Sequence, residues 1–271
     1  MTAAAALLPI EAGDLISAGA LLAVNALVVL TLRLGLERTL AVAVVRMALQ
    51  LAALGYALKI VAAAGSPVWT AALALAMLAA ASRALMEQRS YRLAGWWSDG
   101  LCLAALTVVG GLASLLAVAA LLKPDAWTPV RALAVLGLLL GHLATAVALV
   151  VDRLSNDVLQ QRSAIETRLA LGGSRFGVLQ PELRTAMRAA MVPVIAGTAG
   201  AGMAGIPEVM AGQILAGADP LAAAIFQVQI MLLLSAATSV AVLMAGLGGV
   251  VLLTDARHRL RLDRLSRRRP A

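Results

Sequence analysis

The chain has 271 residues, of which 62% are hydrophobic and 13% are charged, and its mean hydropathy is +0.92. Soluble domains are about 45–50% apolar and about 25% charged, so this composition excludes an ordinary soluble domain and predicts a membrane protein with several spans. Aromatic residues make up only 3% of the chain, whereas Ala and Gly are frequent. Small residues of this kind let helices pack closely in lipid.

The 22 Lys and Arg residues exceed the 14 Asp and Glu residues, which gives a formal net charge of +8. In a chain this apolar, we interpret the excess as a topology signal and as contact with anionic membrane lipid, rather than as a nucleic-acid interface. The single cysteine, Cys102, excludes a disulfide within the chain. We interpret it as a small packing residue.

Apolar runs of roughly 20 residues, the length that a helix needs to cross a bilayer, recur along the chain. Turn signals such as Gly65-Ser66-Pro67, Lys123-Pro124-Asp125 and Asp219-Pro220 separate them. The predicted fold is an all-α integral membrane protein, a bundle of about seven transmembrane helices in one domain covering residues 1–271. The expected spans are 14–32, 40–61, 66–84, 99–122, 130–151, 189–207 and 221–252.

Most Lys and Arg residues lie in connections that seven spans place on one face, including the polar segment 152–188 and the basic tail 255–271. Because Lys and Arg are enriched in cytoplasmic loops, this asymmetry predicts a cytoplasmic C-terminus and an N-terminus outside. The tail is interpreted as a membrane-surface anchor on anionic lipid, with docking to a partner protein as the minor alternative.

In the second expected span, Arg46 and Gln50 are four residues apart and share one helix face. A mid-span arginine costs about 2.5–3.5 kcal/mol on insertion scales, so Arg46 should face protein or water. Two interpretations stay open. Arg46 extends its head group to the membrane surface or forms an ion pair with another helix, for instance through Glu37, or it lines a transport pathway.

After the third expected span, Arg89 and Arg92 adjoin Trp96 and Trp97, which is typical of a cytoplasmic interface belt. His142 is a lone imidazole within the fifth expected span. No second His or Cys lies at ligand spacing. A hydrogen bond to a neighbouring helix is therefore favoured over a metal site, and no metal is assigned.

The polar segment 152–188 has the pattern of two helices joined by a glycine turn. Gly172-Gly173 predicts the turn, and Ser174 is a candidate N-cap for a second helix that runs straight into the sixth expected span. Such an element would dock on a partner and transmit a push, although a helix lying at the lipid interface has the same pattern. The first helix carries one apolar stripe, formed by Leu154, Val158, Ile165 and Leu169.

The last expected span carries polar or soft side chains on one face of an otherwise apolar helix, and interhelical hydrogen bonding and lining of a pathway are both consistent with them. Before it, Pro207 and Gly212 are expected to break the sixth helix near the outer face. Glu208 there is either a cation ligand or an ordinary loop carboxylate, and the ligands are too few to name a metal. The candidate pathway residues are Arg46, Gln50, Glu208, Met210, Gln213, Gln227, Met231 and Ser235.

The segment 165–174 resembles the cytoplasmic coupling loop of ABC transporter permeases, in which Glu and small residues precede Leu-Gly-Ala/Gly-Ser or Thr. The later stretches LRTAMRAAMVPVI, IPEVMAGQILAGADPLAAAIFQVQIM and LLTDARHRL are similar to the FetB-type permease family. These are iron-export ABC permeases of bacteria, related to plant proteins linked to aluminium tolerance. The similarity covers most of the chain, and residues 210–220 are its most specific part.

One motif departs from the family pattern. Where the family commonly has Pro-Gly-Met-Met-Thr-Gly-Gln, this chain has PEVMAGQ at 207–213. It lacks one Met and the Thr hydroxyl, and it gains the Glu208 carboxylate. The departure weakens the transfer of a substrate from the family and leaves the coupling resemblance untouched.

The resemblance implies the permease subunit of an ABC transporter in the bacterial cytoplasmic (inner) membrane, exporting iron or another metal or small solute. It implies two permease copies, as a homodimer, and two copies of a separate ATPase subunit that carries ATP and Mg²⁺. The residues implied in coupling to that ATPase are Ile165, Glu166, Leu169, Ala170, Leu171, Gly172 and Gly173.

The residues themselves do not indicate an enzyme. A phosphate-binding GxxxxGK[ST] loop is absent, and the glycine-rich LGGSRFG lacks the Lys that reaches phosphates. No His/Cys cluster, carboxylate pair within a span or Ser/His/Asp set is present. We therefore expect no cofactor and no ATP hydrolysis on this chain. The alternative to an ATP-driven permease is a motor-independent channel or secondary transporter.

Overall fold

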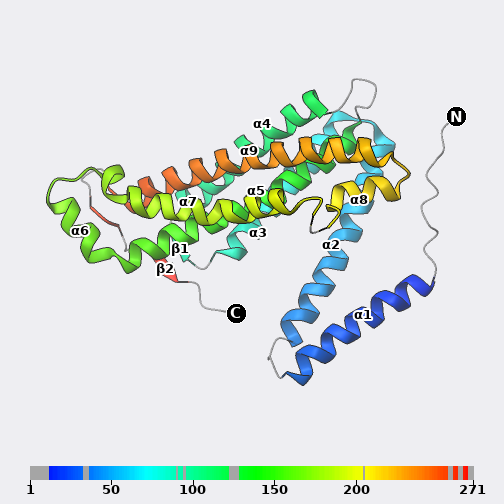
Figure 1. The fold of residues 1–271 in the computed structure, drawn as a ribbon, viewed down its shortest axis with the longest axis horizontal. Coiled ribbons are helices and arrows are strands. Elements are labelled where there is room, and N and C mark those ends of the chain that lie inside the picture. Colours follow the sequence, from blue (N-terminus) through cyan, green and yellow to red (C-terminus); the bar gives the residue numbers. More distant parts are fainter. Residues whose placement is uncertain are drawn as a thin grey trace.

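The computed structural model describes residues 12–32, 37–89, 91–93, 96–121, 128–203, 205–255, 259–261 and 265–267. In this part of the chain, helices form an elongated bundle and two short strands form an antiparallel ribbon (Figure 1). The elements are α1 Ala12–Thr31, α2 Glu37–Ala64, α3 Pro67–Gln88, β1 Tyr91–Leu93, α4 Trp96–Leu121, α5 Pro129–Gln160, α6 Arg162–Ala170, α7 Arg175–Gly200, α8 Glu208–Leu215, α9 Pro220–Leu253 and β2 Leu265–Arg267.

Three long helices begin with the same sequence device. Ser66, Thr128 and Asp219 are the N-caps of α3, α5 and α9, and each side-chain oxygen accepts a backbone N–H of the first turn. A proline follows each cap, and its missing N–H is not needed at the first helical position. The turns predicted before α3 and α9 are therefore confirmed, whereas Lys123-Pro124-Asp125 lies outside the described residues.

Helix α5 is the centre of the bundle and packs against α3, α4, α7 and α9. Its side chains Leu143, Val147 and Val150 are fully buried. Helix α9 presents small residues to it, and a Cβ placed on Gly249 would come 3.0 Å from Leu154 Cδ2. Since lipid tails are as apolar as leucine, such an interface is held by close packing rather than by exclusion of water.

The outward faces of the helices are also apolar. Leu115 of α4 and Leu232 of α9 are more than half exposed. Helices α1 and α2 extend away from the rest of the bundle (Figure 1), with Leu21 and Tyr56 among their exposed side chains. A soluble monomer rarely exposes apolar surface of this extent, so these faces are suited to lipid or to further membrane helices.

Five of the described helices, α2, α3, α4, α5 and α9, are long and apolar enough to cross a membrane. The predicted all-α membrane architecture is thus confirmed, while the count of seven spans stays a prediction. The other two expected spans correspond to α1, with its shorter apolar helix Gly19–Thr31, and to the later part of α7. Helix α7 ends at Gly200 instead of residue 207.

The polar segment does not begin as a separate element at residue 152. Helix α5 continues to Gln160, and Gln161 alone separates it from α6. The ribbon was not predicted. It pairs Tyr91 of β1 with Arg267 of β2, so the part of the basic tail that the structure describes returns to the segment after α3.

Cys102 is buried, as expected of a packing residue. Arg89 was predicted in an interface belt, and this prediction is wrong. The residue is only 3% exposed, and its Nη1 donates to Cys102 Sγ at 3.6 Å. Arg89 follows directly after α3 and so meets the start of α4. The side chains of Arg92, Trp96 and Trp97 lie outside the described residues.

Candidate coupling elbow and transport cleft

Helix α6, the turn 171–174 and the first turns of α7 project from one end of the bundle (Figure 1). We call residues 162–182 the elbow. Gly172 has φ 90°, a conformation that glycine adopts without strain. At Gly173 a Cβ would lie 2.5 Å from Val178 Cγ2. Ser174 Oγ accepts the N–H of Gly177 at 3.2 Å, so the predicted turn and N-cap are confirmed.

The predicted apolar stripe anchors the elbow to the bundle. Leu154, Val158 and Ile165 are fully buried, and Leu169 is nearly so. The stripe continues past the interruption at Gln161. Of the predicted coupling residues, Ile165 and Leu169 therefore face inward, and the exposed ones are Glu166, Ala170, Leu171 and Gly172, with Gly173 partly covered.

The exposed side of the elbow has apolar and charged features. Leu171 at the turn is 84% exposed, and Phe176 beside it is exposed beneath the Arg175 guanidinium, 5.2 Å from the ring centroid. Glu166 accepts from Arg162 Nε at 2.8 Å. The sequence analysis did not single out Phe176. Its signal is a rare aromatic residue next to the predicted turn.

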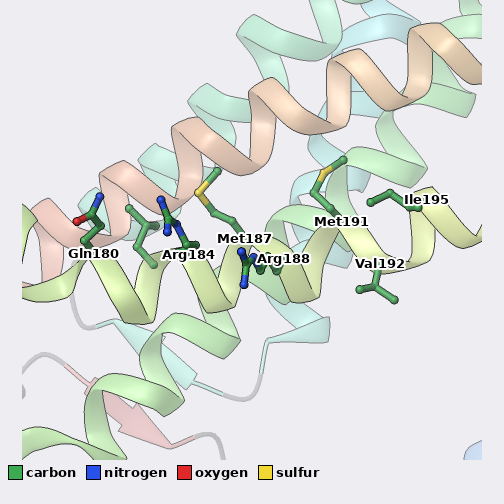
Figure 2. Close-up of a pocket in the computed structure, with 8 residues that line it drawn as sticks. Gln180, Arg184, Met187, Arg188, Met191, Val192 and Ile195 are labelled. Atoms are coloured by element: carbon green, nitrogen blue, oxygen red, sulfur yellow. The ribbon is translucent and has the colours of Figure 1, made fainter.

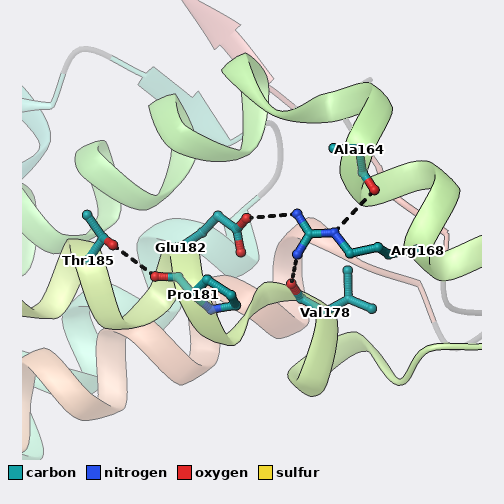
Figure 3. Close-up of polar contacts among 6 residues, drawn as sticks. All are labelled: Ala164, Arg168, Val178, Pro181, Glu182 and Thr185. Carbon is teal, nitrogen blue, oxygen red and sulfur yellow. Dashed lines mark hydrogen bonds and ion pairs between the residues drawn. The ribbon is translucent and has the colours of Figure 1, made fainter.

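A buried ion pair inside the elbow was also missed. Arg168 of α6 donates from Nη2 to Glu182 Oε1 of α7 at 3.4 Å, and from Nη1 to the carbonyl of Val178 at 3.4 Å (Figure 3). Its Nε donates to the carbonyl of Ala164 at 3.3 Å. A carboxylate taken out of water needs such a partner, so this arginine fixes the angle between α6 and α7.

Three neighbouring cavities of about 570, 480 and 90 Å³ share lining residues. The 570 Å³ cavity lies between α5 and α7, the other two are also lined by α9, and the 480 Å³ cavity extends to α8. Together we call them the cleft. His142 lines all three, while Met231 and Pro193 each line two. The cleft thus brings together three of the predicted pathway residues, Glu208, Gln227 and Met231.

His142 was predicted to bond to a neighbouring helix, and this is wrong. Its Nδ1 lies 2.9 Å from the carbonyl oxygen of Leu138, one turn earlier in α5 itself. A carbonyl only accepts, so Nδ1 carries the proton. In the neutral imidazole, Nε2 is then a free acceptor. Thr238 also lines the cleft, is fully buried, and its hydroxyl has no hydrogen-bond partner within the described residues.

Two of the pathway candidates, Gln227 of the cleft and Ser235, take part in local hydrogen bonds. Gln227 Oε1 accepts the N–H of Met210 at 3.1 Å, which holds the start of α8 against α9. Ser235 accepts the Ser239 hydroxyl on its carbonyl at 2.9 Å. Met210, Gln213 and Ser235 do not line the cleft. Gly212 lies inside α8, so the chain is broken before Pro207 and not at Gly212.

Arg46 lies outside the cleft, on α2. Its Nη1 is 2.6 Å from Glu87 Oε2 of α3, and Arg83 Nε is 3.2 Å from the other oxygen. The interpretation that Arg46 forms an ion pair with another helix is therefore confirmed, but its partner is Glu87 and not Glu37. The α2–α3 hairpin brings Glu87 opposite Arg46, whereas Glu37 is nine residues earlier on the same helix. Gln50 also lies on α2, away from the cleft.

Among the described side chains, no group of three or more His, Cys, Asp or Glu could hold a metal ion. The cleft offers one carboxylate, one imidazole and one thioether, from Glu208, His142 and Met231. Hard and soft ligands are mixed in this set, so it does not match the preference of one metal class.

These features define the class as a multi-helix membrane protein, with an elbow at one end of α7 and a cleft lined further along the same helix. The chain belongs to the family described as "Uncharacterised protein family (UPF0014)", whose model matches residues 12–251. The resemblance to FetB-type permeases is confirmed by the relatives.

"UPF0014 membrane protein YjkA" of Bacillus subtilis (strain 168) is 30% identical over 199 residues, 73% of this chain and 77% of the relative. "Probable iron export permease protein FetB" of Escherichia coli (strain K12) is 25% identical over 236 residues, 87% of this chain and 89% of the relative. "Protein ALUMINUM SENSITIVE 3" of Arabidopsis thaliana is 26% identical over 207 residues, 76% and 74% of the two chains. No solved structure matches.

Proposed function

We propose that this chain is the membrane-spanning permease subunit of an ABC transporter, driven by a separate ATPase that carries ATP and Mg²⁺. The observation that carries the proposal is the continuity of α7. The helix begins at the exposed elbow turn and lines the cleft with Pro193, Val194 and Gly197. Its 26 residues extend about 39 Å at about 1.5 Å per residue. A push on the turn therefore reaches the cleft through one element.

Pro193 supplies a place for that motion to act. A proline inside a helix removes one backbone hydrogen bond and softens or kinks the helix at that point. Pro193 lies inside α7 and lines two of the three cavities. Displacement of the elbow would thus change the width of the cleft beside His142.

The cargo we propose is a metal cation such as iron, or another small solute, moved outward. The printed name of the E. coli relative supports iron export, and Glu208 is the one charged residue among those lining the cleft. We further propose two copies of the permease with two ATPase subunits, in the bacterial cytoplasmic membrane. The N-terminus would lie outside, and the elbow and C-terminus would lie in the cytoplasm.

The test is co-expression with an ABC ATPase encoded beside the gene of this chain. We expect the two proteins to co-purify and ATP hydrolysis to be faster in the complex. Liposomes holding both should move Fe²⁺ only with ATP. Transport by the chain alone at the same rate would reject the motor and favour a channel or secondary transporter.

A further inference from the structure

We propose that the groove along α7 binds a phospholipid with an anionic headgroup, from the leaflet on the side of the elbow (Figure 2). The groove has a volume of about 650 Å³ and is lined by residues of α7. It is separate from the cleft, and the proposal does not depend on the transported cargo. Its lining includes Arg184, Met187, Arg188, Met191, Val192 and Ile195.

The two arginines supply the headgroup contact. Arg184 and Arg188 are four residues apart, so their exposed guanidinium groups lie one turn apart on α7. In the described part of the chain neither has a carboxylate partner, unlike Arg46, Arg153 and Arg168. None of the described residues that line the groove is acidic. Neighbouring guanidinium groups donate several hydrogen bonds to one phosphate and favour it over a zwitterionic headgroup with its own cation.

The apolar residues follow the arginines in the order that a lipid requires. Val192 and Ile195 are each 59% exposed. From Arg184 to Ile195 the helix rises about 16 Å, which is about half of a hydrocarbon core of about 30 Å. The phosphate contact and the acyl-chain contact are therefore one leaflet apart, with the headgroup nearer the elbow.

Helix α9 makes room for the groove. A Cβ on Gly246 would lie 2.7 Å from Leu183 Cδ1 and 3.7 Å from Met187 Cγ. The Ser239 hydroxyl oxygen lies 3.8 Å from Met191 Sδ. Because these α9 residues are small, Met187 and Met191 turn toward α9 (Figure 2) and form a soft apolar floor.

The positions of the charges along α7 favour an anionic lipid as the occupant of the groove. An ATPase docked at the elbow turn would meet Leu171, whereas Arg184 lies nine residues beyond Arg175, the first residue of α7, which is about 13 Å along the helix. A second copy covering the groove would have to place carboxylates opposite both arginines and apolar side chains beyond them. An anionic lipid provides this order of charge and hydrocarbon without a dedicated partner, and membrane surfaces attract basic residues at this depth.

The test uses the full chain in detergent, titrated with phosphatidylglycerol or with phosphatidylcholine of the same acyl chains and followed by native mass spectrometry. We expect tighter binding of phosphatidylglycerol. Arg184→Gln/Arg188→Gln should weaken it about fivefold for each arginine. The control Arg38→Gln/Lys59→Gln removes two exposed charges from α2 and should leave binding unchanged. Arg184→Lys/Arg188→Lys should retain most of it.

Glycerol phosphate is the competitor that separates lipid from free phosphate, and it should not displace the lipid at equal concentration. The proposal is overturned if the double Gln variant binds phosphatidylglycerol as the unmodified chain does, or if glycerol phosphate competes equally. It is also overturned if the variant loses self-association and keeps its lipid, because the groove would then be a contact between copies. If the double variant does not fold, the single variants carry the same test.

Discussion

Arg168 on α6 and Glu182 on α7 are joined across the elbow turn, with Nη2 3.4 Å from Oε1 (Figure 3). The Glu182 side chain is 1% exposed and the Arg168 side chain 40%. The carboxylate therefore depends on this partner, while the guanidinium also meets water. Since the same arginine bonds to the backbone of both helices, the elbow moves as one piece. The proposed coupling to an ATPase needs this rigidity, because a push on the turn must reach α7.

Removing the arginine should loosen the elbow. Breaking a buried ion pair costs about 3–5 kcal/mol, and because Arg168 is partly exposed we expect Arg168→Gln to lower the free energy of unfolding by about 1–3 kcal/mol. Arg168→Gln/Glu182→Gln should lose less, because no unpaired buried charge remains. Thermal unfolding in detergent and protease cleavage at the elbow measure both.

The control is Arg162→Gln, which breaks the exposed pair with Glu166. Surface pairs of this kind are worth about 0.3–0.5 kcal/mol. If Arg168→Gln is no more destabilising than this control, the ion pair does not hold the elbow.

The turn offers a test of docking that leaves the fold intact. Leu171 is 84% exposed, so Leu171→Asp should change stability by at most about 0.5 kcal/mol. It should nevertheless abolish stimulation of the partner ATPase, because it puts a charge into the proposed contact. Leu215→Asp is the matched control, since Leu215 is 88% exposed at the end of α8, far from the elbow. Equal stimulation by both variants would remove the elbow from the coupling role.

The sequence predicts well what is decided within a few residues. The Gly172-Gly173 turn, the Ser174 cap and the buried stripe with Ile165 follow from glycine conformation, capping chemistry and helical spacing. These features depend on neighbours in the chain, so they can be read before any tertiary contact is known. The membrane character follows equally directly from composition.

Features that depend on which helices meet were not predictable from spacing. Arg46 pairs with Glu87 only because the hairpin brings position 87 opposite position 46. The lone His142 has no ligand motif around it, and its place in the cleft comes from the packing of α7 and α9 beside α5. The residues from Leu154 onward were predicted to be helical, but their continuity with α5 as far as Gln160 was missed because the change from apolar to polar residues at Asp152 was interpreted as the end of the span.

Variants of Arg46 and His142 test whether the transport pathway follows the cleft or the α2–α3 hairpin. Arg46 lies outside the cleft and pairs with Glu87, so Arg46→Gln should leave transport through the cleft unchanged once protein amounts are equalised. His142→Leu should reduce transport while assembly with the ATPase is kept, because the aliphatic side chain has no acceptor in place of the imidazole Nε2. ATP-dependent uptake of Fe²⁺ into inverted vesicles measures both variants. If the Arg46 variant lost transport and the His142 variant kept it, the pathway would lie along α2 instead of the cleft.

Thr238→Val tests the cleft because it is expected to raise the stability of the protein and to lower transport. The Thr238 hydroxyl is fully buried without a hydrogen-bond partner among the described residues. An unsatisfied buried hydroxyl costs about 1–3 kcal/mol, and an apolar group of the same shape removes that cost. We therefore expect Thr238→Val to raise the unfolding temperature in detergent.

If the hydroxyl contacts passing cargo or its water in the 90 Å³ cavity beside His142 and Met231, transport should fall in the same variant. Ser239→Ala, one residue further along α9 and outside the cleft, should leave transport unchanged. A Thr238→Val chain that is both more stable and fully active would show that the hydroxyl has no part in the pathway.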